Sequence, residues 1–171
     1  AGERELVMAI NVSHAQLREP DFVATVQKAM TDSGVPPSSV ELEITESMAA
    51  DDLAVIRPLL MAVCALGVSV AIDDFGTGFS SLSVLRHLPA QRLKIDRSFI
   101  NELEDDDSIA RMVISLGQSL GMRITAEGVE TEAQRQALCA LGCEEGQGWL
   151  FARALNEAEL LAWLAERRQG R

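Results

Sequence analysis

The chain has 171 residues, of which 47% are hydrophobic and 24% charged, a composition typical of a globular domain with its own core. Its formal net charge of -11 argues against binding along a DNA or RNA backbone, because such binding needs clustered Lys and Arg to contact the phosphates. We see neither a signal-peptide pattern nor an apolar run of about 18 residues, so we expect no membrane contact from this segment. The expected location is the cytoplasm, either alone or as the cytoplasmic part of a larger, membrane-attached signalling protein.

Strand-like and helix-like segments alternate along the whole chain. Alternating and β-branched patterns predict strands at residues 6–12, 40–45, 68–73, 92–96, 122–127 and 146–151. Periodic apolar patterns predict helices at residues 21–33, 53–66, 109–120, 131–141 and 156–168. Strands that recur about every 25 to 35 residues with helices between them are typical of a parallel sheet. We therefore predict one α/β domain over residues 1–171.

Several conspicuous residues have a structural explanation that requires no functional site. The three cysteines, Cys64, Cys139 and Cys143, are odd in number and have no histidine near them in the sequence, so we expect buried, reduced thiols rather than zinc ligands. Trp163 lies on the apolar face of the last helix and is expected in the core. The acidic run at residues 102–107 precedes a helix start, where solvated carboxylates interact favourably with the helix dipole.

Residues 68–81 carry the clearest functional signal in the chain. A β-branched run ends in Asp73 and Asp74, and a loop punctuated by Gly76 and Gly78 follows. Because alternate residues of a strand leave opposite faces, Asp73 points away from the apolar side chains of its strand, while Asp74 turns away as the loop begins. Aspartates and glycines after a strand are also ordinary turn residues, so this stretch alone leaves both explanations open.

The other predicted strands repeat the pattern and favour a site. Near the ends of four of them, a polar residue lies on the face opposite the apolar side chains. In a barrel of parallel strands the apolar face meets the helices and the other face points inward. We therefore predict that five residues converge at the carboxyl-terminal mouth of the barrel, namely Asn11, Glu43, Asp73, Lys94 and Glu127.

A divalent metal site follows from this convergence. Clustered carboxylates repel one another unless a cation compensates them, and oxygen donors without Cys or His favour Mg²⁺ or Mn²⁺. Asp74, next to Asp73, supplies enough carboxylates for two metals, the arrangement that supports phosphoester hydrolysis. A metal-dependent barrel that abstracts a proton beside a carboxylate, with Lys94 as the base, is compatible with the same residues.

The order of the motifs also resembles that of bacterial EAL domains. The resemblance rests on Asn11-Val12-Ser13, Glu43-Ile44-Thr45-Glu46, Asp73-Asp74-Phe75-Gly76-Thr77-Gly78, Lys94-Ile95-Asp96, Glu127-Gly128-Val129-Glu130 and Gln147-Gly148-Trp149-Leu150-Phe151. It implies a TIM-barrel-like α/β fold that hydrolyses cyclic di-GMP to linear pGpG at a two-metal site holding Mg²⁺ or Mn²⁺. A homodimer formed through the loop at residues 74–81 is also implied.

The resemblance assigns a role to each matching residue. The implied metal ligands are Asn11, Glu43, Asp73, Asp74 and Glu127. The implied catalytic residues are Glu127, which would accept a proton from the attacking water, Lys94, which would orient that water, and Asp74 at the metals. The implied supporting residues are Gln147 near metal-bound water or substrate, Glu46 as the anchor of the loop at residues 74–81, and Glu130 and Asp96 beside the site.

The chain departs from the family pattern at its beginning. The tripeptide Glu-Ala-Leu that names the family is absent, and Glu157-Ala158-Glu159-Leu160 in the last helix does not match it. About six strand-helix units are predicted, whereas a closed barrel of about 250 residues has eight. The expected fold is thus the C-terminal two-thirds of an EAL domain, without its first strands and helices and with impaired activity. The alternative is a non-catalytic cyclic di-GMP receptor or a dimerising regulatory or scaffold module.

Overall fold

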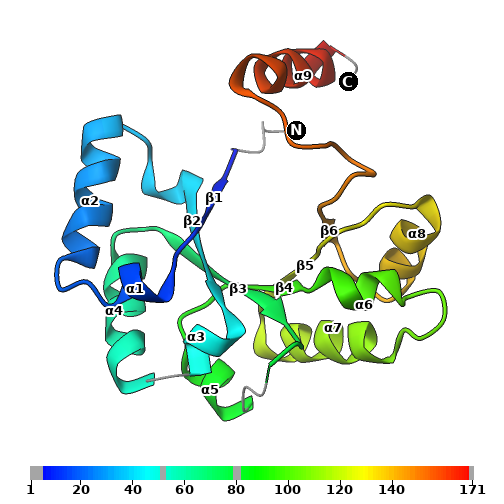
Figure 1. Cartoon of the computed structure of the whole chain (residues 1–171), viewed down its shortest axis with the longest axis horizontal. Helices are drawn as coiled ribbons and strands as arrows, with labels where there is room; N and C mark the ends of the chain where they lie inside the picture. Colours follow the sequence, from blue (N-terminus) through cyan, green and yellow to red (C-terminus); the bar gives the residue numbers. More distant parts are fainter. Residues whose placement is uncertain (1–5, 51–52, 79–81, 170–171) are drawn as a thin grey trace.

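A curled parallel sheet organises the computed structural model, which describes residues 6–50, 53–78 and 82–169. Its strands, in sheet order, are β1 (Met8–Asn11), β2 (Val40–Thr45), β3 (Ser69–Phe75), β4 (Arg92–Ile95), β5 (Arg123–Ala126) and β6 (Glu145–Gly146). Every neighbouring pair is parallel. Figure 1 shows the sheet as an open half-barrel with most of the helices on its outer side. This confirms the predicted incomplete TIM-barrel-like α/β fold.

Helices connect the strands. The described helices are α1 (His14–Leu17), α2 (Phe22–Ser33), α3 (Glu46–Ala50), α4 (Leu53–Ala65), α5 (Leu82–His87), α6 (Arg97–Asn101), α7 (Ser108–Leu120), α8 (Glu132–Ala140) and α9 (Glu157–Gln169), with a 3-10 turn at Pro37–Ser39. The five longer helices begin and end within one residue of their predicted limits. Helices α1, α3, α5 and α6 were not predicted, because four to six residues are too few to show a periodic apolar pattern.

The apolar face of each strand packs against the helices. Ile44, Ile72 and Leu93, from three neighbouring strands, are buried in one core with Leu60 of α4 and Ile114 of α7. Burying a side chain of this size stabilises a fold by about 1.5–3 kcal/mol. The core therefore lies between sheet and helices, which leaves the concave face of the sheet to the polar side chains.

The ends of two strands differ from the prediction. Strand β3 continues past Asp73 to Phe75, which pairs with Ile95 after a shift of register, and Asp74 within this irregularity has a φ of 54°. Asp74 is thus part of the strand and does not turn away in a loop.

Strand β6 ends at Gly146, so the predicted strand at residues 146–151 is wrong over most of its length. Gly148 has a φ of 153°, a conformation that favours glycine, and the N–H of Phe151 donates to the carbonyl of Gly148 at 3.0 Å. The chain therefore turns at this point and cannot continue along the sheet.

The predicted burial of the cysteines is wrong for two of the three. All three are free, as expected, but Cys139 is exposed and Cys64 is half-buried, so Cys143 alone of the three is buried. Cys139 lies on the outer face of α8, whose buried positions are Gln134 and Leu138. The predicted solvation of the acidic run is confirmed, since Glu102, Glu104, Asp105 and Asp106 are exposed ahead of α7.

Helix α9 stands apart from the curled sheet, beyond its open side (Figure 1). Trp163 is only half-buried there, and Leu161 is 60% exposed, so the expected place of Trp163 in the core is wrong. The Asn156 side chain caps the helix as its sequence predicts, accepting the N–H of Glu159 at 3.0 Å. Among the described helices, none combines the length and the apolar character needed to cross a bilayer.

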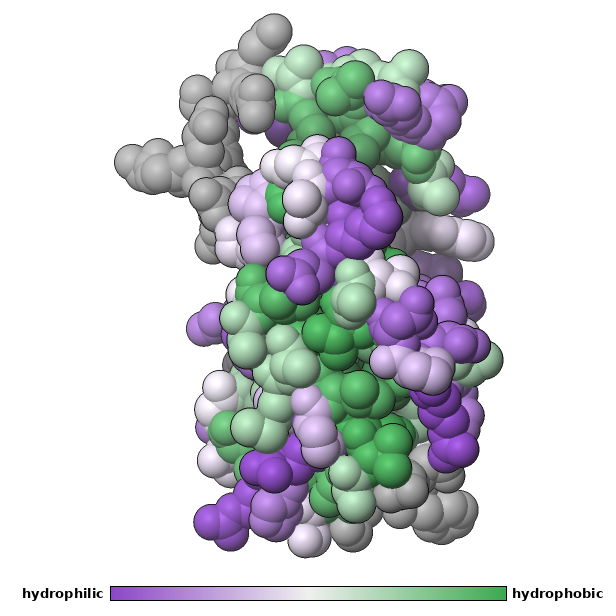
Figure 2. Space-filling view, turned by 90° about the vertical axis from the view of Figure 1, so that its left-hand side faces the viewer, coloured by the Kyte–Doolittle hydropathy of each residue, from purple (hydrophilic) through white to green (hydrophobic). Residues whose placement is uncertain are grey.

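The outer side of β1 borders an apolar groove. Figure 2, which views the molecule from the α2 side, shows apolar residues gathered along this face. The groove has a volume of about 580 Å³ and runs between β1 and α2, with Ile10, Phe22, Val26 and Met30 among its lining residues. Met8 is 60% exposed at this edge, and β1 pairs only with β2 within the described part of the chain.

Candidate metal centre at the mouth of the curled sheet

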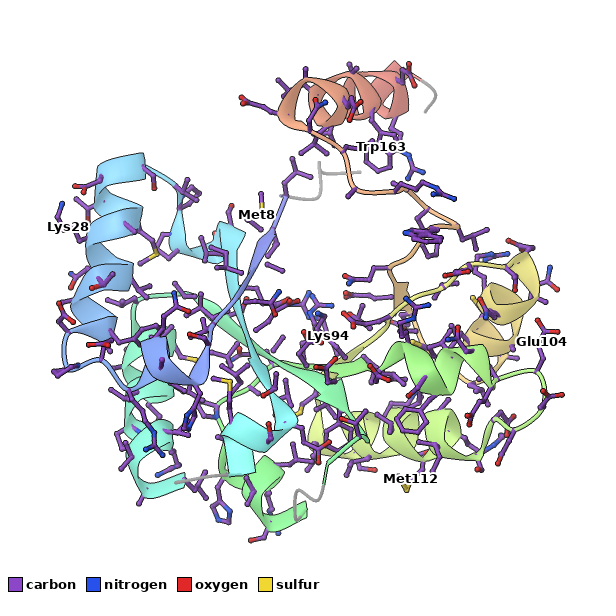
Figure 3. The ribbon with its side chains drawn as sticks, viewed as in Figure 1. Met8, Lys28, Lys94, Glu104, Met112 and Trp163 are labelled. Carbon is purple, nitrogen blue, oxygen red and sulfur yellow. The ribbon has the colours of Figure 1, made fainter. Side chains whose placement is uncertain are left out.

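Lys94 lies among the polar side chains of the concave face (Figure 3). Its Nζ lies 2.7 Å from Glu43 Oε1, 3.0 Å from Asp73 Oδ1 and 2.5 Å from Glu127 Oε1. The four side chains are between 4% and 16% exposed. They come from β2, β3, β4 and the residue after β5, so the curvature of the sheet brings the carboxyl ends of four strands to one point.

The charges of this group do not balance, because one ammonium faces three carboxylates. Burial by itself would lower the pKa of Lys94, but hydrogen bonds to Glu127, Glu43 and Asp73 outweigh burial and raise it above its usual value. Lys94 is therefore a cation at neutral pH. Burial raises the pKa of Glu127, while Lys94 opposes that shift. The excess of negative charge is what a bound metal ion would relieve.

Three carboxylates at the mouth are close enough to share a metal ion. Oxygen atoms of Asp73, Asp74 and Glu127 all lie within 4.8 Å of one another. The left-handed conformation of Asp74 accounts for this, since neighbours in a regular strand point to opposite faces. Partial burial, followed by the charges of Asp73 and Asp96, raises the pKa of Asp74. Three crowded carboxylate oxygens without a thiol or imidazole fit a hard cation such as Mg²⁺ or Mn²⁺.

Two further predicted residues border this group. Asn11 ends β1 and is the register partner of Glu43, so the two residues share the concave face of the sheet. Gln147 follows β6, and its Nε2 donates to Glu127 Oε1 at 2.9 Å. Neither is buried, which leaves both accessible from the mouth.

Asp96 and Glu130 lie beside the mouth and not in its centre. Strand β4 ends before Asp96, whose side chain accepts the N–H of Ser98 at 2.9 Å and caps α6. The electrostatic contact of Asp96 with Asp74 links it to the acidic group. Glu130 is exposed, with its carboxylate 3.9 Å from Nη2 of Arg97.

Glu46 holds the chain that follows β3. Its carboxylate is buried, and Oε2 accepts the backbone N–H groups of Gly76 at 2.8 Å and Gly78 at 3.2 Å. A Cβ on Gly78 would lie 3.2 Å from this carboxylate, so glycine permits the close approach. The start of the predicted loop is thus anchored, while residues 79–81 of that loop lie outside the described residues.

A second polar layer lies below Lys94, and the sequence analysis assigned it no role. Nε of Arg92 lies 2.9 Å from Glu41 Oε1, and its Nη1 donates to Thr125 Oγ1 at 2.6 Å and to Glu145 Oε2. Arg92 lies two residues before Lys94, and Glu145 lies two residues before Gln147. Since every second side chain of a strand lies on the same face, this spacing was the signal that could have placed Arg92 and Glu145 on the concave face.

Comparison with known protein families identifies the family of the chain. The profile of the EAL domain matches residues 1–154. The bifunctional diguanylate cyclase/cyclic di-GMP phosphodiesterase MucR of Pseudomonas aeruginosa is 44% identical over 167 residues, which are 96% of this chain and 24% of MucR. The chain therefore spans about a quarter of the length of that relative.

Solved structures agree with the sequence comparison. The EAL domain of Mycobacterium smegmatis DcpA superposes with a TM-score of 0.88 at 44% identity, over 94% of this chain and 73% of the DcpA domain. The manganese and cyclic di-GMP complex of BlrP1 from Klebsiella pneumoniae superposes with a TM-score of 0.80 at 30% identity, over 87% of this chain and 39% of BlrP1. These matches cover the curled sheet that carries the acidic group.

Proposed function

Because the chain belongs to the EAL domain family, we propose that its acidic site hydrolyses cyclic di-GMP to linear pGpG. The observation that carries the proposal is the group of Asp73, Asp74 and Glu127, with carboxylate oxygens within 4.8 Å of one another beside the charged Lys94. The names of MucR, as a phosphodiesterase, and of the BlrP1 complex support the same substrate. The chain would thus act as a phosphodiesterase in second-messenger signalling.

We propose that two Mg²⁺ or Mn²⁺ ions are the cofactors. Asp73, Asp74 and Glu127 would hold the first ligand positions, and Asn11 and Glu43 complete the proposed set from the neighbouring strands. Bound metal ions would polarise the phosphodiester and lower the pKa of a bound water. The choice between Mg²⁺ and Mn²⁺ belongs to this proposal, and the BlrP1 complex, which contains manganese together with cyclic di-GMP, supports it.

The residues of the chain would contribute position and charge. In the hydrolysis, a water oxygen forms a bond to phosphorus while one P–O bond of the cyclic dinucleotide breaks, and the sugar oxygen that leaves takes up a proton from solvent water. The three N–H groups of Lys94 face Glu43, Asp73 and Glu127, so Lys94 would keep two of these carboxylates in place and would donate the remaining hydrogen bond to orient this water. Glu127 would accept the proton that the water loses, and Gln147, bonded to Glu127, would fix the direction of its carboxylate.

Other parts of the function remain predictions. Glu130 and Asp96 would support the mouth through Arg97 and α6. A homodimer through the loop at residues 74–81, a cytoplasmic location and the absence of DNA or RNA partners stay expectations from the sequence. Cyclic di-GMP is the one ligand that we propose for this site.

The direct test measures production of pGpG from cyclic di-GMP in Mg²⁺ or Mn²⁺ by two purified proteins. One is the 171-residue chain, and the other is the same chain extended at its N-terminus by about 80 residues, toward the usual length of a barrel. We expect the extended chain to hydrolyse the dinucleotide and the 171-residue chain to be slower by orders of magnitude. Binding of cyclic di-GMP without pGpG from either chain, in either metal, would contradict the proposal and favour a receptor.

A Glu46→Ala variant of the extended chain tests the loop anchor. Losing the acceptor leaves two backbone N–H groups without their partner, which costs about 1–3 kcal/mol locally. We expect faster hydrogen exchange at Gly76 and Gly78, and a joint fall of turnover and of the dimer fraction, while Mn²⁺ still binds. Unchanged turnover and an unchanged dimer mass would rule out an anchoring role for Glu46.

Gly148→Ala tests the packing of the turn that carries Gln147. A Cβ at Gly148 would lie 2.3 Å from the backbone N and O of Val129, so the two segments would have to separate. A displacement of about 1 Å at a reacting group lowers turnover up to about a hundredfold, and we expect a loss of that order in the extended chain.

Gly121→Ala is the matched control, since Gly121 also has positive φ, 70°, but nothing within 4 Å of its Cβ position. We expect it to lower stability by about 1–2 kcal/mol and to leave turnover within about twofold. Equal turnover in the two variants would show that close packing at Gly148 does not matter.

A further inference from the structure

The polar layer around Arg92 is in register with the metal centre above it. Each of its members lies two residues before a residue of the upper group, in the pairs Glu41 and Glu43, Arg92 and Lys94, Thr125 and Glu127, and Glu145 and Gln147. Two residues of a strand form one short, stiff repeat of about 6.6 Å. A lower side chain that is held in place therefore restrains the upper residue of the same strand.

Strand β6 is the member of the sheet that most needs such a restraint. It has two residues, and within the described chain it pairs only with β5, through Thr125 with Glu145 and Ala126 with Gly146. The N–H of Gln147 adds one hydrogen bond to Ala126 O at 2.8 Å. The opposite edge of β6 has no partner strand among the described residues.

Arg92 supplies the side-chain link between β6 and the centre of the sheet. It is 8% exposed, and its guanidinium contacts Glu41 on β2, Thr125 on β5 and Glu145 on β6. Glu145 is less buried, with 37% of its side chain exposed, and without Arg92 it would keep only the long contacts with Thr125 at 3.5 Å and with the exposed Arg123 at 3.7 Å. One buried cation on β4 therefore connects to three other strands, through partners that lie up to 53 positions from Arg92 in the sequence.

A hollow of about 220 Å³ is lined by residues of both layers, among them Arg92, Lys94, Glu145 and Gln147. The backbone of Gln147 is held by hydrogen bonds to Ala126 at 2.8 Å and to Val129 at 3.0 Å. The direction of its side chain consequently depends on this backbone and on whatever fixes Glu145 at the start of β6.

We propose that Arg92 is a positioning residue of the metal centre. By holding Glu145, it fixes β6 so that Gln147 keeps its hydrogen bond to Glu127. The inference rests on the proposed function, because Glu127 acts there as metal ligand and proton acceptor. Within the described residues, the polar partners of the Arg92 side chain are Glu41, Thr125 and Glu145, and we assign none of these three to the metal ions or to the substrate.

The first measurement needs no enzymatic activity. We would compare Arg92→Met and Glu145→Gln with the parent 171-residue chain by NMR, following hydrogen exchange at the backbone amide of Gln147 and the shift of its side-chain amide. We expect exchange at Gln147 to rise at least about tenfold in Arg92→Met and less in Glu145→Gln.

The matched control is Arg123→Met. Arg123 is the register partner of Arg92 on β5, it is 57% exposed, and it lies 3.7 Å from the same Glu145. We expect Gln147 to exchange within about twofold of the parent in this variant, since an exposed ion pair restrains little. Arg92→Lys keeps the charge, so the amide of Gln147 should exchange more slowly in this variant than in Arg92→Met. If Arg92→Met does not fold, Arg92→Lys and Glu145→Gln together test whether Arg92 positions Gln147.

The second measurement separates positioning from a general loss of stability. In the extended chain, Arg92→Met should lower turnover of cyclic di-GMP about tenfold, but should have little further effect in a Gln147→Ala background, because coupled residues are not additive. Unchanged Gln147 exchange in both Arg92 variants, or fully additive losses of turnover, would overturn the proposal. An extended parent chain that neither binds Mn²⁺ nor forms pGpG would instead refute the proposed function, whereas the hydrogen exchange of Gln147 would still decide whether Arg92 has a positioning role.

Discussion

Asp73→Asn in the extended chain is expected to lower hydrolysis of cyclic di-GMP by at least about a hundredfold, because it removes a charge from the proposed metal centre and keeps the shape of the side chain. Asp73 is buried, its Oδ1 lies 3.0 Å from Lys94 Nζ, and its carboxylate belongs to the group with Asp74 and Glu127. The loss should appear in the turnover and in a weaker affinity for Mn²⁺, measured separately by titration of the protein with the metal alone.

The control for this variant is Asp105→Asn. Asp105 lies in the exposed acidic run before α7, and the substitution makes the same change of charge far from the mouth of the sheet. We expect turnover within about twofold of the parent and a melting temperature within about 2 °C, since isolated surface substitutions change stability by about 0.5 kcal/mol or less. Full activity of Asp73→Asn in Mg²⁺ would refute the assignment of Asp73 as a metal ligand.

Lys94→Met is expected to have the largest effect on the metal-free protein. Glu43, Asp73 and Glu127 share this one ammonium, and their side chains are 7%, 12% and 16% exposed. Leaving buried charges without their partner costs about 3–5 kcal/mol, so the melting temperature should fall by about 10 °C. Turnover should fall as well, because Lys94 is the residue that we propose to orient the water.

The same variant makes a prediction of opposite sign for the metal. Without Lys94, the carboxylates should gain more from a bound cation, so Mn²⁺ should raise the melting temperature of Lys94→Met by more than that of the parent. Lys28→Met is the control, since Lys28 is 75% exposed beside Asp32 and its loss should cost less than about 1 kcal/mol. An equal response of Lys94→Met and the parent to Mn²⁺ would show that Lys94 and the metal do not act on the same carboxylates.

The amino-acid sequence by itself determined the order of the strands and the face of each strand that points inward. Period-two alternation predicts that Glu43, Asp73 and Lys94 oppose their apolar neighbours, and the structure places all three on the concave face. Glycines at helix ends predict the stops of α2 and α7, and Gly34 and Gly121 adopt the expected left-handed conformation there. These features are local, so neighbouring residues are sufficient to specify them.

Tertiary structure alone decided the contacts that alternation along single strands does not specify. The contact of Arg92 with Glu145 joins positions 53 residues apart and depends on how far the sheet curls between β4 and β6. The place of Asp74 beside Asp73 depends on a φ of 54°, which arises where the register of β3 against β4 shifts. Alternation, which assumes a regular strand, assigns Asp74 to the opposite face.

The exposure of Trp163 has the same kind of cause. Its helix carries apolar residues that the sequence pattern assigns to a packing face, but a pattern does not specify what lies opposite that face. In the structure α9 lies beyond the open side of the sheet, so Trp163 stays half-buried. Local sequence therefore determined the elements and the direction of their side chains, whereas the curvature of the sheet, a property of all strands together, decided the distances that make the site.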